Sequence, residues 1–320
     1  MNNKDLYSRV QVLANSIRNG ELLSLVTYIG KDLVSNLPVH TTVENMVHRV
    51  LKIIRDEYVA GQNDKIEETD PQESLHKMVT SGHDHEDYMK PIPDLKMSVL
   101  DHVAEFEEEL EISRGNIAAQ ASEHIHSNEI IMTLGRSQVV EAFLKNAAKT
   151  RKFEVIVAEC APLCMGHDLA VNLGKSKIQT TVISDAAIFA IMSRVNKVII
   201  GTHTVMANGG LRAISGSHIM ALAAKHYSVP VFVLAPMYKL SRHFLCSSDQ
   251  QAFNLYESPE GVLRYSDGEL ASKVQAYNPA FDYVPPELVT LFISNVGGHS
   301  PSYIYRLISE LYHPDDNDLR

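Results

Sequence analysis

The segment from Lys197 to Pro236 most constrains the fold of this chain. An apolar run, KVIIG, leads into a glycine-containing loop, GTHTVMANGG, and a small-residue helix and a second apolar run, VPVFVLAP, are expected to follow. This order is typical of a β–loop–α–β unit, which forms a ligand pocket at the carboxyl ends of parallel strands. Where chemistry would require a carboxylate or a lysine, however, the segment offers Thr202, His203, Gly210 and Ile214. It therefore predicts an enzyme-like scaffold without an obvious acid–base pair.

The alternation of apolar runs with helical patterns extends over residues 127–320. Short, nearly continuous apolar runs predict strands at 129–135, 154–159, 179–184, 197–202 and 230–236, and a further strand within 287–298. Helical patterns occupy 137–150, 167–176, 185–195 and 211–227. Strands that alternate with helices and are apolar throughout indicate a parallel sheet covered on both faces. We expect a Rossmann-like, doubly wound α/β domain over 127–320.

Residues 1–126 have a different pattern and predict a helical domain. Apolar residues recur at three-and-four spacing in 43–59, and 95–125 is a second long helical candidate that carries the acidic run EFEEELE. Between them, residues 60–93 are polar, acidic and interrupted by prolines, so an acidic loop is expected there, with one short helix near 73–79. The fold class is α/β with an N-terminal helical domain.

Composition excludes several classes of protein. The formal net charge of -10 disfavours direct nucleic-acid binding. No run of about 18 apolar residues predicts a membrane span, and the N-terminus lacks the apolar core of a signal peptide. Three cysteines do not form a disulfide framework. We therefore expect a cytoplasmic (cytosolic) protein with no membrane partner.

Four blocks resemble one known family. They are residues 155–173 (VIVAECAPLCMGHDLAVNL), 183–226, 278–295 (NPAFDYVPPELVTLFISN) and 300–316 (SPSYIYRLISELYHPDD). They are similar to the family shared by regulatory subunits of translation initiation factor 2B and by isomerases of methylthioribose 1-phosphate and ribose 1,5-bisphosphate. The likeness runs from about Thr42 to the C-terminus, and by this comparison about one helix of the family's N-terminus is missing.

The resemblance places the isomerase site residues on this sequence. Gly135 stands where the isomerases have a catalytic cysteine, and His203 stands where they have a catalytic aspartate. Glu159 is retained from a Glu-Thr-Arg-Pro run, but Ala161 and Met165 replace the Arg and Gln that grip the substrate. The retained residues suit tight turns, whereas the lost ones carry charge or protons.

Downstream positions follow the same trend, since Asn208 is kept while Gly210, Ala213 and Ile214 replace Asp, Asn and Lys. Arg136 and Arg212 stand at candidate helix starts, where backbone N–H groups could hold an anion. The resemblance thus implies no catalytic residue and a vestigial pocket of Gly135, Arg136, Glu159, His203, Asn208 and Arg212.

No metal site or cofactor is expected. Cys160, Cys164 and His167 could suggest metal binding, but their spacing matches no common zinc site. The residues 83–86, His-Asp-His-Glu, lie in the acidic loop, where a solvated surface is the simpler interpretation. Chain segments of the form GxxxxGK[ST], which would bind nucleotide phosphates, are missing from the sequence.

The resemblance implies a noncatalytic, regulatory subunit of the complex that exchanges guanine nucleotide on initiation factor 2. Its expected partners are the delta and alpha subunits, the catalytic gamma–epsilon pair, and initiation factor 2 through its alpha subunit, whose phosphorylation the subunit would help to sense. The alternative is an active sugar-phosphate aldose–ketose isomerase with relocated catalytic groups. Gly135 and His203 argue against that alternative.

The C-terminal segment PSYIYRLISELY predicts an assembly tail. Its aromatic and aliphatic residues are too numerous for a free helix to leave in water. We expect this tail to be buried and to support pairing with a homologous delta subunit. Its candidate residues are Tyr303, Tyr305, Leu307 and Leu311.

Overall fold

The computed structural model describes residues 22–37, 40–63, 95–244, 254–271 and 273–316. The chain divides into two compact units, one of residues 1–109 with 309–320 and one of residues 110–308. The change of sequence pattern predicts this boundary at 126/127, with the whole tail in the sheet domain. The boundary lies earlier because one continuous helix, α5 (Leu95–Ala119), supplies apolar residues to both cores.

The helical unit contains α2 (Leu22–Asn36), α3 (Thr41–Asn63) and the first part of α5. Apolar residues three and four apart on each helix bury one face. They form a single core of Leu22, Val26, Val47, Val50, Leu51, Ile53, Ile54, Tyr58, Leu95, Val99 and Val103.

The helices predicted at 43–59 and 95–125 are confirmed, with shifted ends. Residues 60–63 belong to α3 and not to the acidic loop, and α2 was not predicted. The remainder of that loop, including the short helix near 73–79 and the cluster at 83–86, lies outside the described residues.

The second unit is built on a seven-stranded sheet with the order β10-β9-β7-β4-β1-β2-β3. All neighbouring strands are parallel except β10, which runs antiparallel to β9. This order confirms the predicted doubly wound sheet. From β1 the chain adds strands first toward one edge of the sheet and then, starting with β4, toward the other edge, so the strand order reverses between β1 and β4. The strands are β1 (Ile130–Leu134), β2 (Glu154–Ala158), β3 (Gln179–Ile183), β4 (Lys197–Gly201), β7 (Val231–Leu234), β9 (Leu291–Ser294) and β10 (Gly297–His299).

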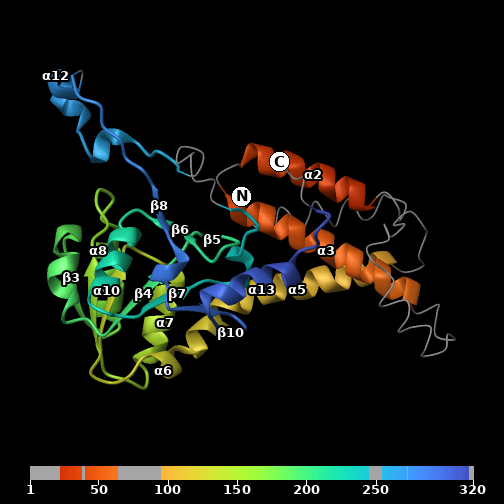
Figure 1. The fold of residues 1–320 in the computed structure, drawn as a ribbon, viewed down its shortest axis with the longest axis horizontal. Coiled ribbons are helices and arrows are strands. Elements are labelled where there is room, and N and C mark those ends of the chain that lie inside the picture. The colour runs from red at the N-terminus through yellow and green to blue at the C-terminus, as the bar shows by residue number, and fades with distance from the viewer. Residues whose placement is uncertain (1–21, 38–39, 64–94, 245–253, 272, 317–320) are drawn as a thin grey trace. The chain divides into compact units, whose positions relative to one another are not determined.

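Helices follow the strands, as the alternating pattern predicted (Figure 1). Ser137 caps α7, because its hydroxyl accepts a hydrogen bond from the backbone N–H of Val140. One apolar core joins the end of α5, the helices at 121–124, 138–147 and 165–175, and the sheet. The helices of this unit are α6 (Ala121–His124), α7 (Gln138–Ala147), α8 (Met165–Lys175), α9 (Ile188–Met192), α10 (Ser217–His226), α12 (Gly268–Ala271) and α13 (Ile304–Leu311), the last of which crosses into the helical unit at residue 309.

The predicted helix at 211–227 is wrong in its first part, because residues 211–214 belong to a second sheet. Leu211–Ile214 forms β6, which pairs antiparallel with β5 (Thr204–Val205) and with β8 (Phe281–Val284). Only Ser217–His226 is helical, after Gly216 turns the chain at φ +96°. Pairing on both edges of β6 overrides the helical propensity of its residues. Among the described helices, none is long and apolar enough to cross a membrane.

Candidate functional site

A cavity of about 650 Å³ lies at the carboxyl ends of the parallel strands, next to the reversal between β1 and β4. This is the place where ligands bind in open α/β sheets. Its lining comes from the loops after β1, β2, β4 and β7, and from the segment that precedes β8. Among the lining residues are Arg136, Cys160, His203, Lys239, Glu257 and Tyr277.

Gly135 lies just beneath this cavity and adopts a left-handed backbone, with φ at +60°. A Cβ atom at this position would lie 3.3 Å from the Cβ of Cys160 and 3.5 Å from its sulfur. The side chain of Cys160 therefore fills the space into which a residue 135 side chain would point. Beside it, Arg136 lines the cavity and lies 3.4 Å from the exposed carboxylate of Asp168.

Cys160 brings a thiol to the cavity, but in an inactive form. Its backbone N–H donates to the carboxylate of Asp185 over 2.9 Å, and that of Ala161 donates over 2.7 Å. The thiol faces the carbonyl oxygen of Ser215 at 3.7 Å. Burial, together with the charge of Asp185, raises the pKa of Cys160 to about 12. The thiol is therefore protonated at neutral pH and is neither a nucleophile nor a base.

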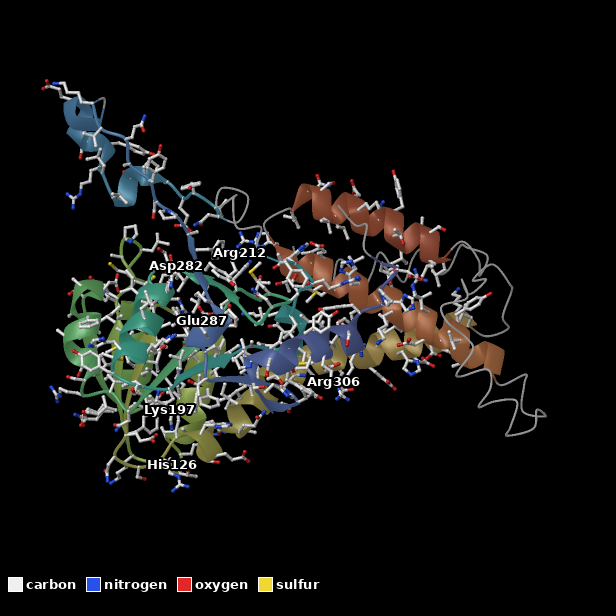
Figure 2. All side chains as sticks on the ribbon, in the orientation of Figure 1. His126, Lys197, Arg212, Asp282, Glu287 and Arg306 are labelled. Carbon is white, nitrogen blue, oxygen red and sulfur yellow. The ribbon has the colours of Figure 1, made fainter. Side chains whose placement is uncertain are left out.

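His203 lines the cavity after β4, and its ring stacks on Phe281 with centroids 4.9 Å apart. The guanidinium of Arg212 lies 4.4 Å from the centre of the same Phe281 ring. Arg212 is buried in β6, so the prediction that it begins a helix is wrong. Figure 2 shows Arg212 with Asp282 above the sheet, far from Lys197 at the start of β4. The backbone N–H of His203 donates to the carbonyl oxygen of Arg212 over 3.0 Å.

The other predicted pocket residues have local roles outside the cavity lining. The side-chain oxygen of Asn208 accepts from the N–H of Gly210 over 2.9 Å, and its amide donates to the hydroxyl of Tyr283 over 2.9 Å. Glu159 lies 3.5 Å from the ring nitrogen of His167. Of the six predicted residues, only Arg136 and His203 line the cavity.

Lys239 is a cavity residue that the sequence analysis missed. It ends a short 3₁₀ turn, Met237–Lys239, directly after β7, and its ammonium donates to the carbonyl oxygen of Thr202 over 2.7 Å. Burial lowers the pKa of Lys239. A lysine that closely follows a buried parallel strand was the available signal, because that position is the ligand end of the sheet.

Within the described residues, no three His, Cys, Asp or Glu side chains come together as metal ligands. The cavity therefore offers positive charge from Arg136 and Lys239, a carboxylate from Glu257, an imidazole and a protonated thiol. This set can hold a small polar molecule by charge and hydrogen bonds.

A second feature is an apolar surface that we name the α9–α10 face, made of Phe189, Ile219, Leu222 and Tyr227. Ile219 and Leu222 lie three residues apart on α10 and are 61% and 50% exposed. The ring of Phe189, from α9, lies 5.3 Å from that of Tyr227 and is also exposed. Large apolar side chains gathered on one surface mark sites of protein contact.

The C-terminal segment has two kinds of side chain. Leu307 is buried and Leu311 is half-buried. Tyr303 and Tyr305 are exposed, Tyr305 by 66%. Part of the predicted assembly tail, Tyr312 included, is thus packed within the chain, whereas Tyr303 and Tyr305 remain accessible.

The sequence matches the initiation factor 2 subunit family over residues 8–301. It is 43% identical to the beta subunit of translation initiation factor eIF2B from Dictyostelium discoideum, over 92% of this chain and 85% of that protein. It is 36% identical to the same subunit from Schizosaccharomyces pombe, over 93% and 87%.

Comparison with solved structures also finds eIF2B beta and a complex that contains it. The crystal structure of eIF2B beta from Chaetomium thermophilum covers 97% of this chain and matches 86% of its own, with a TM-score of 0.73 and 27% identity. The tetrameric eIF2B beta2–delta2 complex from C. thermophilum contains a chain that matches with a TM-score of 0.69 and 27% identity, over 96% of this chain and 86% of that one.

A more distant relative is the ribose 1,5-bisphosphate isomerase of Archaeoglobus fulgidus, 28% identical over 68% of this chain and 69% of that protein. The match to the beta subunits is both closer and longer. The chain belongs to the initiation factor 2 subunit family.

Proposed function

We propose that this chain is a noncatalytic, regulatory subunit of the guanine-nucleotide exchange complex for initiation factor 2, in the role of the eIF2B beta subunits. The observation that carries the proposal is the identity of 43% and 36% to those subunits over more than nine-tenths of the chain. In this role the chain acts in the cytosol, where it helps to bind initiation factor 2 and to respond to phosphorylation of that factor's alpha subunit.

The cavity supports a noncatalytic role. Aldose–ketose isomerisation needs groups that take and return a proton next to a carbonyl. The thiol that reaches this cavity, that of Cys160, is held protonated, and position 135 carries no side chain at all. His203 is stacked against Phe281. Purified protein given ribose 1,5-bisphosphate should yield no ketose above background, and turnover that disappears in His203→Ala would establish the isomerase alternative.

The α9–α10 face supports assembly. The solved C. thermophilum complex joins beta and delta subunits in a tetramer. The delta subunit of Dictyostelium discoideum is 26% identical to this chain, over 66% of this chain's length. We assign the α9–α10 face to pairing with a delta-type subunit, because it gathers exposed aromatic and aliphatic side chains as interface cores do. The alpha subunit and the gamma–epsilon pair complete the proposed complex, and initiation factor 2 binds to the whole.

The test is co-expression with the delta-type subunit of the same organism, followed by native mass spectrometry. Phe189→Asp with Leu222→Asp should abolish pairing, because it places two charges in an apolar contact. Lys225→Gln is the matched control, since Lys225 is exposed on the same helix. Pairing of the double variant at wild-type strength would contradict the assignment of the face. A wild-type chain that does not pair at all would contradict the proposed function.

A further inference from the structure

The cavity at the carboxyl ends of the strands is given no ligand by the proposal above. Its volume of about 650 Å³ is within the range of small-molecule sites. The charged groups in and around the cavity decide which kind of molecule it can hold. The cationic groups and the carboxylates differ in how they are paired.

The two cationic side chains of the lining, Arg136 and Lys239, already have partners. Nη1 of Arg136 lies 3.4 Å from a carboxylate oxygen of Asp168, and 42% of the Arg136 side chain is exposed. The ammonium of Lys239 donates to the carbonyl oxygen of Thr202 over 2.7 Å. Burial lowers the pKa of Lys239, so its surroundings disfavour the positive charge that an anion would need. An anionic ligand would therefore have to compete with these existing contacts.

Two carboxylates are fixed at the base of the cavity by backbone donors. Asp185 accepts from the N–H groups of Cys160 and Ala161, which both line the cavity, over 2.9 and 2.7 Å. Asp282, which follows the lining residue Phe281, accepts from two N–H groups at the start of α10, over 2.6 and 3.2 Å. Within the described residues, neither carboxylate forms an ion pair with a Lys, Arg or His side chain. Each therefore keeps its negative charge without a cationic partner in contact.

Glu257 places a third carboxylate in the cavity lining itself. Its backbone N–H donates to the carbonyl oxygen of Asn278 over 2.9 Å, which fixes the segment that carries it. Its carboxylate has no hydrogen bond or ion pair in the part of the chain that the structure describes. Together with the other two carboxylates, it adds to the rise that burial causes in the pKa of the Cys160 thiol. The base of the cavity thus lies in a negative field, and a cleft with such a field attracts cations.

One wall of the cavity is apolar. Leu255, Val262 and Tyr277 line it, and all three are exposed side chains of the segment before β8. This wall is held against the loop after β2, because Gly261 packs so closely on Pro162 that a Cβ atom there would lie 2.9 Å from the proline ring. An apolar group gains free energy when it covers such a wall, and the face of a tyrosine ring also attracts an ammonium group.

We propose that the cavity binds an organic cation, a primary ammonium group on an apolar body, with the ammonium paired to Glu257 and the body against the apolar wall. A cation completes the one carboxylate of the lining that has no partner, whereas a phosphate would face three carboxylates. The charge of this ligand is opposite to that of ribose 1,5-bisphosphate, for which the A. fulgidus relative is named.

The first experiment varies the charge of the ligand on a constant phenyl body, by isothermal titration calorimetry of the full chain. The probes are phenethylamine, phenethyl alcohol and phenylacetate, which are cationic, neutral and anionic, and inorganic phosphate. Phenethylamine should bind at least about tenfold more tightly than phenethyl alcohol, and phenylacetate more weakly than either. Tighter binding of phenylacetate or inorganic phosphate than of the amine would overturn the proposal, as would an amine that does not bind at millimolar concentration.

The second experiment varies the protein. Glu257→Gln should weaken the binding of phenethylamine at least about tenfold and leave that of phenethyl alcohol unchanged. Glu260→Gln is the matched control, because it removes one carboxylate from the same segment at an exposed position outside the cavity lining. Equal affinity of the two variants for the amine would overturn the assignment to Glu257.

A third measurement needs no variant. Phenethylamine should slow the hydrogen exchange of residues 255–263 and 277–281 in the wild-type chain and leave that of α10 unchanged. Slowing that is confined to other segments would show that the amine binds elsewhere and would overturn the proposal.

Discussion

Arg55 on α3 and Asp316 near the C-terminus form a buried ion pair within the helical unit. Nη2 of Arg55 lies 2.6 Å from one carboxylate oxygen, and Nε lies 3.2 Å from both. The side chains are 10% and 4% exposed. Lys52, one turn earlier, donates to the backbone carbonyl of Glu310, and His48 places its ring 5.8 Å from that of Tyr312. One face of α3 thus contacts residues 310–316.

Breaking this pair should destabilise the helical unit. Asp316→Asn leaves the Arg55 charge buried beside a neutral amide, and removing one partner of a buried pair costs about 3–5 kcal/mol. Urea unfolding followed by circular dichroism measures the loss. Asp315→Asn is the control, because Asp315 is 54% exposed. Equal midpoints for the two variants would show that the pair contributes little.

Gly135 and Gly174 should respond to alanine in opposite directions. At Gly135, φ of +60° and the side chain of Cys160 oppose a Cβ atom, and the left-handed backbone alone costs about 1–2 kcal/mol. At Gly174, inside α8, a Cβ atom would meet nothing within 4 Å. Gly174→Ala should therefore stabilise the protein by about 0.5–1 kcal/mol. Chemical denaturation of both variants checks the signs, and stabilisation by Gly135→Ala would disprove the close fit around Cys160.

The sequence predicted the large sheet because strands β1, β2, β4 and β7 are buried along most of their length. The apolar runs at Lys197–Gly201 and Val231–Leu234 are nearly continuous, as expected of parallel strands covered on both faces. The second sheet was missed because β6 alternates neither charge nor polarity. Its strand state comes from partners that are distant in sequence, above all Phe281–Val284.

Site residues that directly follow a predicted parallel strand could be predicted from the sequence, because that position lies at the ligand end of the sheet. Arg136 and His203 follow β1 and β4, and both line the cavity. The helical pattern at 211–227 predicts Arg212 at a helix start, whereas pairing with β8 holds its segment as a strand. Glu257 could not be found from the sequence, since it reaches the cavity on a segment whose placement depends on the contact between Gly261 and Pro162.

Cys160 should resist alkylation. With a pKa of about 12, only about one thiol in 10⁴ is ionised at pH 8, and the thiolate is the reactive form. Iodoacetamide at pH 8 should therefore label the half-buried Cys164 well before Cys160, as measured by peptide mass spectrometry. In urea the two cysteines should react at similar rates. Equal labelling of the folded protein would mean that Cys160 is not held in its protonated form.

Lys239 should make stability depend on pH in the alkaline range. Burial lowers the pKa of Lys239 in the folded state below 10.5, so the unfolded chain binds more protons between the two values. The free energy of unfolding should therefore rise with pH across that window, up to about 10.5. Lys239→Met removes the titrating group, so its stability relative to wild type should be highest near pH 7 and decline toward pH 10. Lys225→Met removes the same charge from an exposed position and should show no such decline. Thermal melts at pH 7, 8.5 and 10 provide the comparison, and parallel pH profiles for wild type and Lys239→Met would rule out a desolvated lysine in the cavity.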